Sequence, residues 1–181
     1  FKALWHPVAV ADMSKESALY QRLYIAREDL HFANSFAQHL LKKGWHFAPW
    51  ERRWTTYVQQ AAFTSAFVTA YARPFTRSVG WPEFPMRLAP YLQTELRLHQ
   101  QIILLRHQVY AHSDSSRHNV RPMRIVGHPS AIVGSPFLRL SKDELELAIV
   151  MIRKTISLLE QELEMLMPRI EREPSPSRTP A

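Results

Sequence analysis

The chain has 181 residues with no cysteine, and no two of its four glycines have the spacing of a dinucleotide-binding or Walker loop. Disulfides, thiol catalysis and cysteine zinc sites are therefore excluded, and a bound dinucleotide is not expected. A net charge of +7 with 46% apolar residues indicates a folded, basic domain rather than a disordered chain.

The positive charge is concentrated in the first three quarters of the chain. Residues 1–140 contain 17 Lys and Arg against 8 Asp and Glu, whereas residues 141–167 contain 3 against 6. This distribution favours a polyanionic partner such as RNA, although a basic surface that only faces water fits equally well. No apolar run approaches ~20 residues and no signal sequence is visible, so we expect a cytoplasmic protein with no membrane partner.

The first half of the chain predicts two long helices. The first follows Asp12 or Ser14 and runs to about Lys43, where Gly44 stops it. The second has Pro49 in its first turn and runs to about residue 71, because a proline at position 74 prevents its continuation. The buried face of the first helix is marked by apolar residues three and four apart, namely Leu19, Leu23, Ala26, Leu30, Ala33, Ala37 and Leu40.

The second half predicts two more helices with a small β element between them. A third helix is expected over about 87–112, and a fourth after Ser141, which forms a capping box with Glu144. Short β-branched runs around 127–130 predict a hairpin or flap. Pro168 is expected to end the fourth helix, and residues 168–181 to be a disordered tail. The fourth helix has the most regular apolar stripe, formed by Leu145, Ile149, Ile152, Ile156, Leu159, Leu163 and Leu166.

Together these elements predict an all-α fold with a single domain over residues 1–167. Its architecture is an up-down bundle of four long helices, with the small β-hairpin or flap inserted between the third and fourth. The stripe of the fourth helix must be buried against other helices, either in this chain or in a second copy. With the apolar surface of four long helices, it predicts a homodimer.

The third helix ends on polar residues that packing does not require, because residues 105–114 read LRHQVYAHSD. On a regular helix, Arg106 and His112 lie about 120° apart and ~9 Å apart along the axis, and His112 leans back toward Arg106. A permanent cation and a group that titrates near neutrality can hold a phosphodiester and move its protons without a metal. The alternative is structural: His112 interacts with the helix dipole or Asp114, and Arg106 forms an ordinary ion pair.

The segment Arg106-His107-Gln-Val-Tyr-Ala-His112-Ser-Asp114 resembles the signature of the HEPN superfamily. In that family an arginine is followed four to six residues later by a histidine, near the end of the third long helix of a bundle. The pattern is similar to that of HEPN domains in abortive-infection and toxin systems. The resemblance covers about residues 14–167. A toxin group with the pattern Arg-x4-His-x-Tyr is a poorer match, because Ser113 and Asp114 stand where its tyrosine would be.

The resemblance implies a dimer in which two Arg–His pairs share a cleft, and active members of the family are metal-independent endoribonucleases. His112 would act as general base or acid on the RNA, and Arg106 would stabilise the charge that develops on phosphorus. The segment Tyr71-Ala-Arg73-Pro74-Phe75 also resembles the end of the second helix in some relatives. The residues expected to bind RNA or support the site are His107, Tyr110, Asp114, Tyr71 and Arg73.

The expected partners are RNA, a second copy of the chain and, in a toxin setting, an antitoxin protein, with no cofactor or metal. Two other classes of function stay open. The first is a non-catalytic HEPN module that binds RNA, a nucleotide or a protein, and the second is a structural helical oligomer. The spacing of His99, His107, His112, His118 and His128 matches no metal motif, which favours surface and core histidines.

Two further patterns have two interpretations each. Trp50 and Trp54 lie one helical turn apart beside Arg52 and Arg53, so they either stack on bases or pack in the core, and the spacing favours the core. Arg73 lies where the second helix is expected to end. It either approaches the third helix or binds nearby carbonyls as a cation at the end of its own helix.

Overall fold

The structure is a computed structural model that describes residues 14–107, 119–134 and 139–172. Within these ranges the chain is mostly helical, with one antiparallel hairpin between the third and fourth helices, as the sequence predicts. The helices are α1 (Lys15–Lys43), α2 (Trp54–Ala72), α3 (Gln93–Leu105) and α4 (Lys142–Ile170), and the strands are β1 (Asn119–Ile125) and β2 (His128–Gly134). Single 3-10 turns cover Pro49–Glu51, Arg73–Phe75 and Met86–Leu88.

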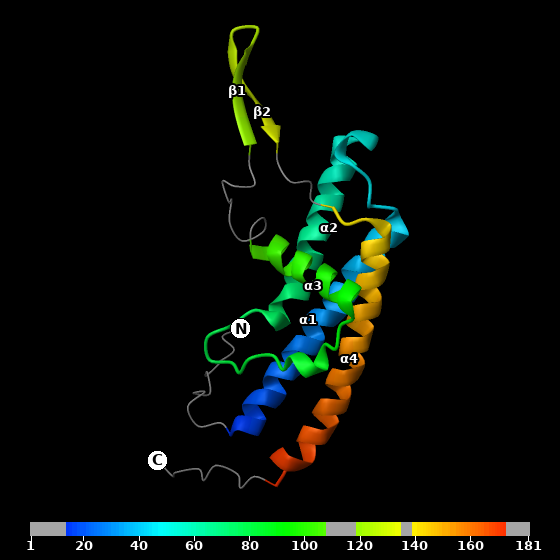
Figure 1. The fold of residues 1–181 in the computed structure, drawn as a ribbon, viewed down its shortest axis with the longest axis vertical. Helices are drawn as coiled ribbons and strands as arrows, with labels where there is room; N and C mark the ends of the chain where they lie inside the picture. The colour runs from blue at the N-terminus through cyan, green and yellow to red at the C-terminus, as the bar shows by residue number, and fades with distance from the viewer. Residues whose placement is uncertain (1–13, 108–118, 135–138, 173–181) are drawn as a thin grey trace, which may run out of the picture.

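Helices α1, α2 and α4 are aligned with one another, and α3 crosses them. In Figure 1, α1 runs antiparallel to α2 and α4, while α3 lies across them. The prediction of four aligned helices is therefore wrong for α3, which crosses the others and begins at Gln93 rather than near residue 87. The predicted end of this helix near residue 112 lies outside the described residues. Pro90 explains its late start, because the residue before a proline is disfavoured in the helical conformation, and Ala89 has φ −127° and ψ 64°.

The ends of α1 and α4 follow the signals in the sequence, with one exception. The Ser14 side chain accepts a hydrogen bond from the Ser17 backbone N–H at 3.1 Å, and Gly44 ends α1 in a left-handed conformation with φ 65°. At the start of α4, Ser141 and Glu144 form the predicted capping box. Pro168 does not end α4, which continues to Ile170, because a missing N–H within two residues of the end removes only one helical hydrogen bond. The predicted tail beyond residue 172 lies outside the described residues.

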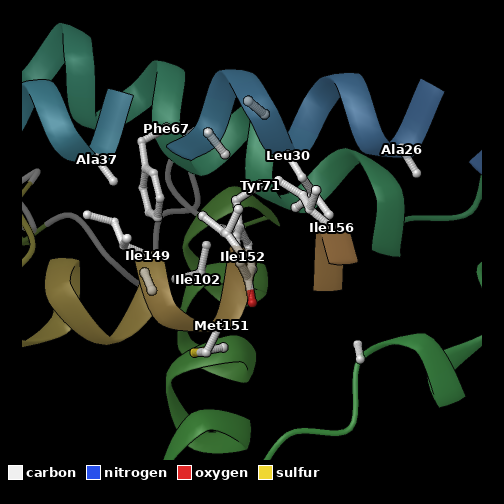
Figure 2. Packing of buried hydrophobic residues seen from close by; sticks show 14 of the residues in the cluster. Ala26, Leu30, Ala37, Phe67, Tyr71, Ile102, Ile149, Met151, Ile152 and Ile156 are labelled. Carbon is white, nitrogen blue, oxygen red and sulfur yellow. The ribbon is translucent and has the colours of Figure 1, made fainter. Parts of the chain in front are cut away.

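The core lies where α1, α2 and α4 meet, and α3 closes one side of it. Figure 2 shows Leu30 of α1, Phe67 of α2 and Ile152 of α4 converging, with Ile102 of α3 beside them. All seven residues of the predicted α4 stripe are buried inside this one chain. That stripe therefore offers no free face to a second copy and does not support a homodimer.

The start of α2 differs from the prediction. The helix begins at Trp54 rather than Pro49, because Arg52 and Arg53 are extended and separate it from the 3-10 turn Pro49–Glu51. As a result Trp50 is 72% exposed and Trp54 is 68% exposed, so the expectation that they pack in the core is wrong. The side of α2 that is buried contains Tyr57, Gln60, Thr64, Phe67, Val68 and Tyr71.

The hairpin projects from one end of the bundle (Figure 1). Val126 and Gly127 connect its strands with φ values of 47° and 81°, the positive values that a tight two-residue hairpin turn needs. Among the helices that the structure describes, none is long and apolar enough to cross a membrane.

Candidate functional site

Arg106 and His107 form a wide, π-type turn directly after α3. Such turns in α-helices occur frequently at functional sites. The Arg106 backbone N–H donates to the carbonyls of Ile102 and Ile103, which keeps the residue in helical conformation. Its Nη1 lies 3.2 Å from Nδ1 of His107. A guanidinium has only donors, so in this contact the Nδ1 of His107 is the acceptor.

Arg106 is half-buried, and none of the described carboxylates forms an ion pair with it. By contrast, Arg27, Arg73 and Arg87 each have a carboxylate partner. Within the described parts of the chain, the alternative of an ordinary ion pair is therefore not observed for Arg106. The guanidinium is available to an anion such as phosphate.

The other half of the predicted catalytic pair is not described. His112, Tyr110 and Asp114 lie outside the described residues, so the structure does not place them relative to Arg106. What it does describe is a shallow, mainly apolar pocket of about 230 Å³ along the last turns of α3, with Arg106 not among its lining residues. The pocket is lined by His99, Gln100, Ile103, Leu104 and His107.

One wall of this pocket belongs to a buried polar cluster formed by Tyr71, Tyr91, His99 and Thr155. The Tyr71 hydroxyl lies 3.0 Å from His99 Nδ1 and 3.5 Å from the Tyr91 hydroxyl, which lies 3.1 Å from Thr155 Oγ1. Thr155 in turn donates to the Met151 carbonyl at 3.0 Å. Tyr71, which the sequence predicts to support the site, is thus buried in the core. Its hydroxyl contacts His99 of α3 and is connected to Thr155 of α4 through Tyr91.

The Met151 carbonyl fixes the direction of every hydrogen bond in the polar cluster. A carbonyl only accepts, so the single Thr155 proton goes to it, and Tyr91 must donate to Thr155. Tyr71 then donates to Tyr91, and His99 donates from Nδ1 to Tyr71. Only this arrangement uses all four contacts as hydrogen bonds, and it leaves Nε2 of His99 without a proton.

Burial keeps every member of the polar cluster neutral. It lowers the pKa of His99 to about 4, and it raises the pKa of Tyr71 and of Tyr91 above the ordinary value. The neutral cluster fixes how α3 crosses α2 and α4, and therefore where α3 presents Arg106.

Arg73 has a different position from either one predicted for it. Its guanidinium binds Asp29 of α1 at 3.1 Å in an exposed ion pair, so it approaches neither α3 nor the pocket. The turn after α2 is held by Arg22, a buried arginine of α1. Nη2 of Arg22 donates to the carbonyls of Arg73, Pro74 and Thr76 at 3.4, 2.6 and 3.2 Å. Burial lowers the pKa of Arg22, and nearby Asp29 opposes that shift.

Sequence reasoning missed the roles of Arg22, Tyr91, His99 and Thr155. Tyr91 and His99 stand in the apolar stripes of the predicted third helix, where a polar side chain is buried only if it finds partners. That signal was present in the sequence, but the partners come from α2 and α4, and pairing across helices is not readable from spacing. For Arg22 the signal is its position one residue before Leu23, next to the buried stripe of α1.

In the described part of the chain, no group of three or more His, Asp or Glu side chains is arranged to hold a metal ion. Comparison with known proteins gives no match, since no family model, no curated protein and no solved structure is significantly similar to this chain.

Proposed function

We propose that the protein is a metal-independent endoribonuclease of the HEPN type, acting as a toxin or defence effector in the cytoplasm. The observation that carries the proposal is the state of Arg106. It lies in a π-type turn at the end of α3, beside the His107 imidazole, and no described carboxylate neutralises it. A half-buried cation without a counter-ion is the donor that a phosphodiester needs.

In the proposed reaction the RNA strand attacks itself. His112 removes the proton of a 2′-hydroxyl, whose oxygen then forms a bond with the adjacent phosphorus. The bond from phosphorus to the 5′-oxygen breaks, and that oxygen takes up a proton from a protonated histidine. The products are a 2′,3′-cyclic phosphate and a free 5′-hydroxyl. Arg106 stabilises the charge that develops on the phosphoryl oxygens, and the Nε2–H of His107 donates to the same phosphate.

A second copy of the chain is part of the proposal, because the family resemblance implies two Arg–His pairs in one cleft. The surface that supports a dimer is on α1 and α2 rather than α4. Ile25 is 45% exposed and Phe32 is 60% exposed on the outer side of α1. Phe32 borders a groove of about 440 Å³ whose other wall is formed by small residues of α2, among them Ala66 and Thr69. An antitoxin protein remains a predicted partner.

The experiment that tests this function is cleavage of mixed RNA by purified protein in EDTA. Arg106→Ala and His112→Ala should each lower the rate by about 10²- to 10⁴-fold, the range typical of lost general acid–base and charge-stabilising groups. Arg106→Lys should also cleave poorly, because a point charge does not replace a two-pronged contact with phosphate. Arg97→Ala, which removes an exposed arginine from the same helix, is the matched control and should cleave normally.

Asp114→Asn should have a milder effect, because Asp114 at most orients His112. Cleavage that requires magnesium, or that survives both alanine substitutions at the wild-type rate, would contradict the proposal. A wild-type protein that binds RNA without cutting it would favour the alternative, a non-catalytic module that binds RNA, a nucleotide or a protein.

A further inference from the structure

The segment Trp50-Glu51-Arg52-Arg53-Trp54 forms an exposed surface between α1 and α2, at the end of the bundle from which the hairpin projects (Figure 1). We call Trp50, Arg52, Arg53 and Trp54 the Trp–Arg patch. Both indoles are more than two-thirds exposed, and both arginines are exposed as well. Tryptophan is highly buried on average, so two such exposed side chains within five residues indicate a surface with a partner.

The acidic residue in this segment does not neutralise the patch. Glu51 turns back and accepts a hydrogen bond from the Ala48 backbone N–H at 3.0 Å. Arg52 and Arg53 form no ion pair with any described carboxylate, and Arg52 lies over the Phe47 ring with its Cζ 5.8 Å from the ring centroid. The patch therefore presents two positive charges between two indoles.

The start of α2 lacks the features that usually stabilise the N-terminus of a helix. Arg53 occupies the N-cap position, where it makes no side-chain capping hydrogen bond, and the first turn contains no acidic residue. Two cations at the positive end of a 19-residue helix oppose the helix dipole. Local sequence features that lower stability are expected at functional sites. A bound anion would make each of these unfavourable interactions favourable, because it would accept from the helix N-terminus and pair with the two cations.

We propose that the Trp–Arg patch binds single-stranded RNA, with bases stacked on Trp50 and Trp54 and phosphates held by Arg52 and Arg53. The patch combines the two components of such sites, which are aromatic faces for bases and cations for the backbone. Trp54 is held in place from below, because its ring centroid lies 5.4 Å from that of Tyr57, which is only 8% exposed. The inference rests on the proposed function for its choice of RNA, and it adds a binding site separate from Arg106.

The test uses the full chain with Arg106→Ala, so that the RNA stays intact, and a labelled oligoadenylate of about 12 nucleotides. Trp50→Ala with Trp54→Ala removes two stacking contacts, so it should weaken binding by roughly 30-fold or more and abolish the quenching of indole fluorescence by RNA. Arg52→Glu with Arg53→Glu should also weaken binding. The negative slope of log affinity against log salt should become shallower by about 1.4, which corresponds to two lost phosphate contacts on a single strand.

The matched controls change the same residue types elsewhere. Arg153→Glu with Arg169→Glu reverses two exposed arginines of α4, and Trp81→Ala removes a partly buried indole from another loop. Both controls should bind the oligonucleotide nearly as the parent does. Inorganic polyphosphate, which has no bases, should bind less tightly and should not distinguish the tryptophan variant from the parent.

Equal effects of patch and control variants would overturn the inference, and so would binding of the parent to anionic phosphatidylglycerol vesicles but not to the oligonucleotide. The outcome is independent of catalysis. If the patch variants lose RNA while the unmodified Arg106 protein cleaves nothing, the patch stands and the endoribonuclease proposal fails. If cleavage depends on Arg106 while the patch variants bind RNA normally, the endoribonuclease proposal stands and the proposal for the Trp–Arg patch fails.

Discussion

The two ends of α2 are built in opposite ways. At its C-terminal end Tyr71 is buried, its hydroxyl contacts His99 and Tyr91, and the following turn is held by three hydrogen bonds from Arg22. At its N-terminal end Trp54 is exposed and Arg53 stands uncapped at the positive end of the helix dipole. One end satisfies its polar groups within the chain, whereas the other leaves them to solvent or a ligand.

This difference separates residues that hold the fold from residues that are available for function. The sequence predicts that Tyr71 binds RNA or supports the site, and its contacts make it part of the framework that positions α3. Trp54 was expected in the core, and its exposure instead makes it a candidate for binding. Substitutions at the C-terminal end of α2 should therefore change stability, and substitutions at the N-terminal end should change RNA binding.

The largest expected loss of stability comes from Arg22→Ala. It leaves three carbonyls without their charged donor in a buried position, and we expect the free energy of unfolding to fall by about 3 kcal/mol. Arg27→Ala is the control on the same helix. Arg27 forms only local contacts, an ion pair with Glu28 and a cation–π contact with Tyr24, and its loss should cost less than about 1 kcal/mol. Urea unfolding of both variants checks the prediction, and equal losses would contradict it.

Tyr71→Phe should have the next largest effect. It removes the hydroxyl in the middle of the polar cluster, so that the Nδ1–H of His99 loses its acceptor inside the core. We expect a loss of about 2 kcal/mol, and less than about 0.5 kcal/mol for Tyr24→Phe, whose ring is 43% exposed. Thermal or urea unfolding of both variants measures the two losses of stability. The prediction fails if the two variants are equally stable.

The polar cluster also predicts a dependence of stability on pH. The pKa of His99 is about 4 in the folded protein and about 6.5 in an unfolded chain, so protonation favours unfolding. The contribution of neutral His99 is complete above pH 6.5 and is lost as the pH falls toward 4. The stability difference between wild type and His99→Gln should therefore shrink across this window, by at most about 1.4 kcal/mol per pH unit. A difference that stays constant from pH 7 to 4 would show that His99 does not titrate as proposed.

The smallest expected effect on stability has the opposite sign. Arg53→Asp supplies the missing N-cap and a negative charge at the positive end of α2, and it should raise the free energy of unfolding by about 1 kcal/mol. The same substitution should weaken RNA binding, because it places a carboxylate in the Trp–Arg patch. Parallel unfolding and RNA titrations test this trade-off. A variant that is both more stable and an equally good binder would remove the functional reason for Arg53.

Spacing and capping signals predicted the parts of the fold that depend on neighbouring residues. The buried faces of α1 and α4, the Ser14 and Ser141 caps and the Gly44 stop are local patterns, and all are confirmed. The direction of α3 was not predictable in this way, because it depends on Pro90 and on hydrogen bonds from Tyr91 and His99 to other helices. Nor was the exposure of Trp50 and Trp54, which follows from two extended arginines between a 3-10 turn and α2.

In the candidate site, too, the sequence predicts what depends on neighbouring residues and not what depends on distant ones. The sequence singled out Arg106 from its place at the end of a helix, and the structure adds that no described carboxylate pairs with it. For Tyr71 and Arg73 the sequence offered only position, and their roles depend on partners far away in the chain. Their contacts are to His99 and Tyr91 in one case and to Asp29 in the other.

The most direct test of the central claim is the chemistry of the RNA ends after incubation with purified protein in EDTA. We predict fragments with a 2′,3′-cyclic phosphate on one side of each cut and a free 5′-hydroxyl on the other, and none from His112→Ala protein. Fragments with a 3′-hydroxyl and a 5′-phosphate, or intact RNA after prolonged incubation with wild-type protein, would contradict the account.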